Sequence, residues 1–263
     1  MDDQKKTDVT GWHARTRAVR GGLRRSEFPA TAARLFLPSG YTYSSGEDAE
    51  AAFRPGGSQN RFVYSRYGNP TVAMFEDRLR LLEGAEGIRA TASGMAAVFA
   101  SLICQLKAGD RVVGSRSVFP SCSYIISDLL PRFGVLSEQI DGTDLNEWER
   151  ALAQPTKAVF LETPSNPMLE IIDVPAVCKL AHRTGARVIV DNVFATPLLQ
   201  KPLELGADIV VYSTTKHLDG QGRSLGGAVL GSRNYIEDEL APFLRHTGPS
   251  LSPFNAWLVL KGL

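Results

Sequence analysis

Lys216 follows the largely apolar segment 208–212, from which it is separated by three residues with hydroxyl side chains, Ser213, Thr214 and Thr215. Most lysines are solvated surface residues, and that is one interpretation of this one. The other interpretation is chemical, because an amine at a strand end can form a Schiff base with a carbonyl group while adjacent hydroxyls bind a phosphate. The segment therefore predicts either a surface lysine or an amine placed for covalent chemistry.

Two further motifs carry groups that a phosphorylated cofactor needs. Ser93 and Gly94 open a predicted helix within "TASGMAA", where free backbone N–H groups and the helix dipole favour a phosphate. The alternative is that Ser93 only caps its own helix. Asp191 ends the apolar run "RVIVD", where a carboxylate needs a partner such as a protonated ring nitrogen. A turn aspartate and a Mg²⁺ ligand are the alternatives for Asp191.

The conjunction of these motifs predicts pyridoxal 5′-phosphate as the cofactor. A lysine would bind its aldehyde, an aspartate would keep its ring nitrogen protonated, and a helix N-terminus would hold its phosphate. The glycine-rich stretch "GQGRSLGG" lacks the G-x-G-x-x-G spacing of a dinucleotide site and precedes a strand rather than following one. A nicotinamide cofactor is therefore not predicted.

These residues are separated by alternating helices and apolar strands. Helical spacing begins at Asn69 and Pro70 and ends at Gly84. Further helices are expected in "GMAAVFASLICQL", "SYIISDLL", "DLNEWERAL" and "VPAVCKLAHRTG", and strands in "RVVG", "KAVFLE", "RVIVD", "DIVVYS" and "GGAVLG". Strands that are apolar throughout are covered on both faces, which predicts an α/β fold with a mainly parallel sheet and helices on both sides. Residues 163–166, Asp191 and residues 213–216 should then share one crevice at the carboxyl ends of the strands.

Composition limits the class of protein. The 263 residues have a formal net charge of +1, so no overall charge steers the chain to nucleic acid or to an anionic membrane. No run is long and apolar enough for a membrane helix, and the N-terminus is too polar for a secretory signal. The three cysteines show no disulfide or metal-ligand spacing, so we expect reduced thiols, no metal and a cytoplasmic protein. Residues 1–68 have little periodicity and are expected to form an extended arm before a large domain at 69–263.

Five segments in the same order resemble the Cys/Met metabolism family of pyridoxal-phosphate enzymes: "VYSRYGNPT", "ATASGMAAV", "ETPSNP", "VDNVFATP" and "YSTTKHLDGQG". The resemblance covers almost the whole chain and implies the large domain of a fold type I enzyme with a seven-stranded sheet. It implies that Lys216 is the Schiff-base lysine and that Asp191 pairs with the pyridine nitrogen. Asn166 would face the hydroxyl of the ring and Phe119 would stack on it, where most of the family has tyrosine.

The resemblance also implies the remaining site residues. Ser93, Gly94, Met95, Ser213 and Thr215 would lie around the phosphate or the lysine. Tyr64 and Arg66 would reach the cofactor phosphate of a neighbouring subunit, and Tyr64 would join Lys216 in catalysis. The active site would therefore be shared within a homodimer, usually part of a homotetramer.

The segments "HLDGQGRSLGG" and "RHTGPSLSPFNAWLVLKGL" are most similar to family members that convert O-succinylhomoserine and sulfide to homocysteine and succinate in methionine biosynthesis. A reaction of the cystathionine γ-synthase or γ-lyase type is the alternative. Family members continue into a smaller C-terminal domain with an arginine for the substrate carboxylate, and no residue here matches that arginine. A catalytically silent pyridoxal-phosphate-binding fragment is thus an alternative of another class.

Overall fold

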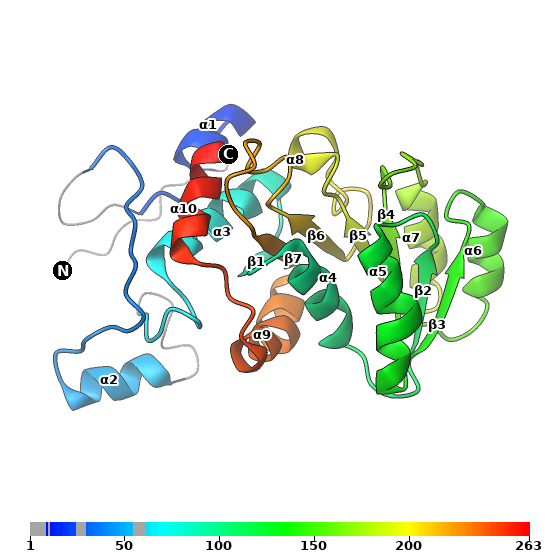
Figure 1. The fold of residues 1–263 in the computed structure, drawn as a ribbon, viewed down its shortest axis with the longest axis horizontal. Helices are drawn as coiled ribbons and strands as arrows, with labels where there is room; N and C mark the ends of the chain where they lie inside the picture. The colour runs from blue at the N-terminus through cyan, green and yellow to red at the C-terminus, as the bar shows by residue number, and fades with distance from the viewer. Residues whose placement is uncertain (1–8, 10, 25–29, 55–61) are drawn as a thin grey trace.

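One seven-stranded sheet organises the chain (Figure 1). The computed structural model describes residues 9, 11–24, 30–54 and 62–263. Its strands are β1 (Gly87–Thr91), β2 (Arg111–Ser115), β3 (Leu136–Ile140), β4 (Ala158–Glu162), β5 (Arg187–Asp191), β6 (Ile209–Ser213) and β7 (Gly227–Gly231). Runs of valine and isoleucine in β5 and β6, and Val159 and Phe160 in β4, favour extended backbone, and the residues of β4 are all buried.

The strand order is β1-β7-β6-β5-β4-β2-β3. The strands from β6 to β3 pair in parallel, whereas β7 runs antiparallel to both β6 and β1. The predicted α/β class with a mainly parallel sheet is confirmed. Strands β1 and β3 were not among the predicted strands.

Helices connect these strands and cover both sides of the sheet. They are α1 (Ala14–Arg20), α2 (Gly46–Phe53), α3 (Pro70–Glu83), α4 (Gly94–Ile103), α5 (Pro120–Tyr124), η1 (Ile125–Leu129), η2 (Leu130–Phe133), α6 (Leu145–Ala151), α7 (Val174–His182), α8 (Thr196–Leu199), η3 (Tyr235–Leu240), α9 (Ala241–Thr247) and α10 (Pro253–Gly262). Helix α3 begins as expected, because Asn69 accepts the N–H groups of Thr71 and Val72 and Pro70 is its first residue. It ends at Gly84, whose φ of 85° is left-handed.

The buried apolar side chains form three clusters. Helices α4, α5 and η3 pack against one side of the sheet, around Phe160 and Val211. On the other side, α6 and α7 cover Val159 and Val190, and α3 and α10 cover Val210 and Leu230. Figure 1 shows α1, α3 and α10 together at one end of the sheet and α6 and α7 at the other. The strands between these layers are shielded from water and packed on both faces. The residues at their carboxyl ends are therefore held in defined positions.

The segment before Asn69 contains two helices, α1 and α2, which the sequence analysis did not expect. Ser45 caps α2 by accepting the N–H of Asp48. Arg78 of α3 donates from Nε to the carbonyl of Gly21 at 3.0 Å, which attaches the end of α1 to the large domain. Part of the N-terminal segment is therefore packed on the sheet layers rather than extended away from them.

Candidate active site

The predicted residues of 163–166, 191 and 213–216 lie at the carboxyl ends of three neighbouring strands, β4, β5 and β6. Glu162 is the register partner of Asp191, and Asp191 is the partner of Val211. The rings of Phe194 and His217 are 5.9 Å apart, so the loop after Asp191 contacts the turn that carries Lys216. The predicted common edge is thus present, and two of its loops touch.

The N-terminus of α4 packs tightly on the end of β6. A methyl group added at Gly94 would lie 2.5 Å from Cβ and 2.9 Å from Oγ of Ser213, so only glycine allows this approach. Ser93 is the N-cap of α4, and its hydroxyl accepts the N–H of Ala96 at 3.1 Å. The N–H groups of Gly94 and Met95 belong to the first turn and have no acceptor inside the helix. The capping role considered for Ser93 is therefore real, and the first turn of α4 still offers donors beside Ser213.

Lys216 lies on a turn immediately after β6. The N–H of Gly220 donates to the carbonyl of Lys216 at 2.9 Å, and the N–H of Asp219 donates to that of Thr214 at 2.9 Å. The side chain of Lys216 is exposed. The hydroxyl of Thr215 bonds the backbone of Gly226, accepting its N–H at 3.1 Å. The backbone around the lysine is thus held while its amine stays accessible.

Asp191 is buried at the end of β5, with 7 % of its surface exposed. It accepts the N–H of Val193 at 3.1 Å, and no ion pair to it is present among the described residues. Burial, and next the charge of Glu162, raise the pKa of Asp191 to about 8. A buried carboxyl without a cation fits a ligand that brings a proton of its own, such as the ring nitrogen of pyridoxal phosphate.

Glu162 joins two further predicted residues. Its Oε2 accepts the N–H of Phe119 at 2.5 Å, and its Oε1 accepts the N–H of Asn166 at 2.9 Å. The ring of Phe119 is exposed, whereas Glu162 is buried. The sequence analysis quoted Glu162 within a motif but gave it no role. A glutamate ending a wholly apolar strand was the available signal.

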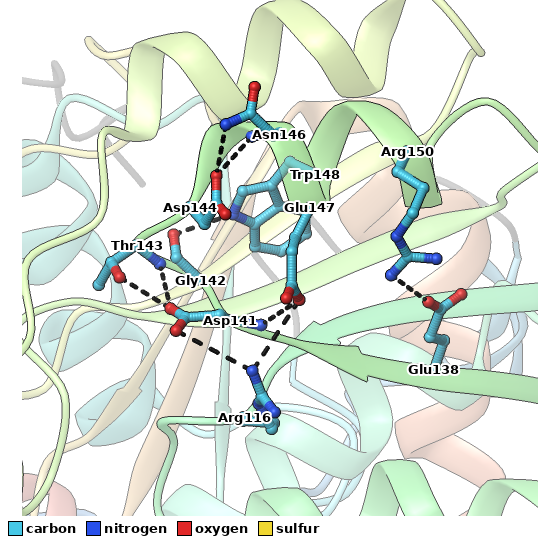
Figure 2. A network of polar contacts seen from close by, with 10 residues as sticks. All are labelled: Arg116, Glu138, Asp141, Gly142, Thr143, Asp144, Asn146, Glu147, Trp148 and Arg150. Carbon is cyan, nitrogen blue, oxygen red and sulfur yellow. Dashed lines mark hydrogen bonds and ion pairs between the residues drawn. The ribbon is translucent and has the colours of Figure 1, made fainter.

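A polar network lies next to the segment that leads from β2 to Phe119 (Figure 2). Arg116, just after β2, points toward Asp141 and Glu147 at 3.9 Å from each, and Glu147 accepts the N–H of Asp141. The buried indole of Trp148 donates to the carbonyl of Gly142 at 2.9 Å. These contacts attach α6 to the ends of β2 and β3. Since Arg116 is exposed, its ion pairs add little stability beyond the buried indole contact.

Among the described residues, Tyr64 and Arg66 make no hydrogen bond, ion pair or ring contact with Lys216 or Asp191. Arg66 lies over the rings of Tyr64 and Tyr67 and donates to the carbonyl of Arg245 in α9. Arg66 also lines a cavity of about 620 Å³ between the N-terminal segment, α3 and α9. Lys216 is not among the residues that line it. A role of Tyr64 and Arg66 in the site of a second subunit stays a prediction.

The described residues hold no cluster of three His, Cys, Asp or Glu side chains that could bind a metal ion. Within the same residues, no helix has the length and apolar character that crossing a membrane requires. Cys104, Cys122 and Cys178 are free thiols. The groups at this edge include the amine of Lys216, the imidazole of His217, the carboxyls of Asp191 and Glu162, hydroxyls and helix N–H groups.

Comparison with known proteins gives a family match over most of the chain. The model of the family described as Cys/Met metabolism PLP-dependent enzyme matches residues 15–263. The O-succinylhomoserine sulfhydrylase of Mycobacterium tuberculosis (strain H37Rv) is 59 % identical over 248 residues, covering 94 % of this chain and 61 % of that protein. The enzyme of the same name from Pseudomonas aeruginosa is 47 % identical over 257 residues, covering 98 % of this chain and 63 % of that protein. The chain thus spans about three fifths of the length of these relatives.

A solved structure agrees with the match. The crystal structure of metB from Corynebacterium glutamicum has a TM-score of 0.90 and 31 % identity, covering 97 % of this chain and 64 % of that one. The agreement extends over the whole sheet and its helices. The edge that carries Lys216 and Asp191 is therefore part of a fold shared with that protein.

Proposed function

The chain belongs to the Cys/Met metabolism family of PLP-dependent enzymes, and on that premise we propose that it binds pyridoxal phosphate at the edge formed by β4, β5 and β6. The observation that carries the proposal is the buried carboxyl of Asp191, which lies one strand from the exposed Lys216 turn. When bound, pyridoxal phosphate supplies an electron sink for the carbon that bears the substrate amino group.

Each residue then has a defined task. The amine of Lys216 would hold the cofactor through its aldehyde and would be the base for the proton on the substrate carbon. Asp191 would hold a proton on the ring nitrogen, since it is buried and makes no ion pair among the described residues. The N–H groups of Gly94 and Met95, with the hydroxyls of Ser213 and Thr215 nearby, hold the phosphate.

Other side chains shape the pocket around the ring. Phe119 gives an exposed aromatic face at the start of α5, suited to stacking on the ring. Asn166 lies on the loop after β4, where its backbone N–H donates to Glu162, and its amide would face the hydroxyl of the ring. The side chain of Met95 packs into the core under α4, which leaves its backbone for binding.

The proposed reaction replaces the succinate (succinyloxy) group on Cγ of O-succinylhomoserine by sulfide. The bond from Cγ to the succinate oxygen breaks, a Cγ–S bond forms, and succinate and homocysteine leave. The choice of this reaction over another of the family depends on the relatives at 59 % and 47 % identity, which are both named for it. We propose this reaction as a step of methionine biosynthesis.

We also propose a shared site in a homodimer or homotetramer, in which Tyr64 and Arg66 reach the phosphate bound by a second subunit. This proposal is supported by their position on the N-terminal segment, where Arg66 contacts Tyr64 and the carbonyl of Arg245 and where no contact of either residue with Lys216 is present among the described residues. The free thiols of Cys104, Cys122 and Cys178 favour a reducing compartment, so we place the protein in the cytoplasm.

Visible absorption of the chain mixed with pyridoxal phosphate tests the proposal. We expect a new absorption band that disappears on dialysis with a competing amine. Addition of O-succinylhomoserine and sulfide, with homocysteine and succinate measured, tests the substrate assignment. Methionine and cystathionine serve as comparison substrates for the lyase alternatives. A band without any product would mean that these residues bind the cofactor but do not suffice for turnover, and no band would refute the cofactor site.

A further inference from the structure

Glu162 is the one acidic side chain that contacts two of the segments around the proposed cofactor among the described residues. It is 4 % exposed at the end of β4. Its two oxygens bond different segments, since Oε2 accepts the N–H of Phe119 and Oε1 accepts the N–H of Asn166. Phe119 begins the helical segment after β2, and Asn166 lies in the loop after β4. One side chain therefore sets the separation of the aromatic face and the amide.

The same carboxyl stands beside Asp191. The two residues are register partners on adjacent parallel strands, β4 and β5. The charge of Glu162 on β4 acts on Asp191, and the thiol of Cys122 on α5 and the phenol of Tyr212 on β6, both with a raised pKa, lie near enough to be affected by the Asp191 carboxyl. Burial raises the pKa of Glu162, while its two backbone hydrogen bonds oppose that rise. The Glu162 charge in turn contributes to the raised pKa of Asp191.

We propose that Glu162 is a positioning residue for pyridoxal phosphate, which fixes the backbone of Phe119 and Asn166 on either side of the ring and places a second carboxyl next to Asp191. The inference rests on the proposed function, because it assigns Glu162 to the cofactor site proposed there. It goes beyond that function in naming a residue that acts through other residues rather than by touching the cofactor.

The chemistry of the contact requires a carboxylate of this length. Two N–H donors need two acceptor oxygens, and a glutamine offers only one, while its NH₂ group opposes the second donor. An aspartate keeps both oxygens and the charge, but it draws them back by one methylene group. Gln and Asp therefore remove different properties of Glu162, and their effects separate its two roles.

Cofactor affinity tests the positioning role. We expect E162Q and E162D each to weaken binding of pyridoxal phosphate about tenfold, equivalent to about 1.4 kcal/mol, measured by titration of the visible absorption. The matched control is E76Q, since Glu76 is also a carboxyl with a pKa raised by burial, and it accepts the N–H of Ala90 at 2.7 Å. Ala90 is on β1, three strands from β5, so E76Q should bind the cofactor like the wild type.

The titration of Asp191 tests the electrostatic role without any cofactor. Carboxyl-carbon NMR of the chain, with Asp191 assigned by the D191N variant, should give a pKa for Asp191 that is lower in E162Q than in the wild type. Removal of a neighbouring negative charge makes ionisation of Asp191 easier, which fixes the direction. E162D retains the charge and should keep most of the raised pKa, and E76Q should leave it unchanged.

The outcomes separate this inference from the proposed function. If the wild type binds no pyridoxal phosphate, the proposed function fails, and an unchanged Asp191 titration in E162Q then overturns the inference as well. If the wild type binds and E162Q matches both its affinity and its Asp191 pKa, only the inference fails. Should E162Q not fold by circular dichroism, E162D still decides the affinity test, since equal binding by E162D and the wild type would overturn the positioning role.

Discussion

Gly94 is the point at which the phosphate-binding half of the proposed site touches the strand that leads to Lys216. It is the first residue of α4, and a Cβ there would lie 2.5 Å from Cβ and 2.9 Å from Cα of Ser213. Ordinary contact begins at 3.4 Å, so α4 and the end of β6 would have to separate by about 0.9 Å to admit the methyl group. Gly94→Ala therefore changes the distance between the helix donors and Lys216 while adding only one carbon.

The expected cost follows from that displacement. Overpacking of a well-packed contact costs about 1–3 kcal/mol, and we expect the free energy of unfolding of G94A to fall by this amount. Displacement of the helix end also moves the N–H groups of Gly94 and Met95 away from the strand. We expect the affinity for pyridoxal phosphate to fall more than tenfold, because the phosphate can no longer bind both elements in one geometry.

Urea denaturation followed by circular dichroism measures the stability, and visible absorption measures the affinity. Gly46→Ala is the matched control, because Gly46 is also the first residue of a helix, α2, and nothing lies within 4 Å of its added Cβ. We expect G46A to range from neutral to about 1 kcal/mol more stable. A G94A chain as stable and as tightly binding as G46A would refute the close-packing argument.

Three further variants test the charged groups. Lys216→Ala should abolish the cofactor absorption band and turnover while leaving the fold intact, whereas Lys201→Ala, which removes a surface ion pair, should retain both. Asp191→Asn should weaken cofactor binding. It should nevertheless raise the free energy of unfolding at pH 8, because the folded wild-type protein loses stability as the pH rises from about 4 toward the raised pKa of Asp191, about 8. The raised pKa of Glu83, about 7, has the same sign, so wild-type stability should fall relative to E83Q between pH 4.5 and 7 by no more than about 3 kcal/mol, and a constant difference in urea titrations would contradict this.

The elements with strong local signals were predictable from the sequence. Helix α3 has a cap, a proline and a terminal glycine at the expected places, and the buried strands β4 to β6 are continuous apolar runs. Strand β3 was missed because "LSEQI" mixes polar and apolar residues, with Leu136 60 % exposed on an edge strand. Strand β1 contains a glycine and an arginine, and only its pairing with β7 makes it a strand. Tertiary pairing, rather than local preference, decides such segments.

The site divides in the same way. Lys216 follows a strand, Asp191 ends one and Ser93 precedes a helix, so their residue types and positions were visible in the sequence. Glu162 and the contact between Gly94 and Ser213 were not visible, because they depend on which strands become neighbours. A linear pattern can show which groups have the chemistry. The linear sequence does not show from which backbone N–H group a buried carboxylate will accept a hydrogen bond.

The position of Lys216 depends on contacts that lie outside the sheet. Asp219, three residues after it, is buried and accepts the N–H, Nε and Nη2 groups of Arg223 at 2.6 to 3.0 Å. Arg223 also donates to the carbonyl of Leu258 in α10. Gly262, the last residue of α10, packs closely on the same turn, because a Cβ atom placed on it would lie only 2.6 Å from the carbonyl oxygen of Asp219. Since a turn has few hydrogen bonds of its own, this ion pair and α10 together restrict where the lysine backbone can lie. The side chain of Lys216 is thus exposed while its backbone is held by a helix that begins 37 residues later in the chain.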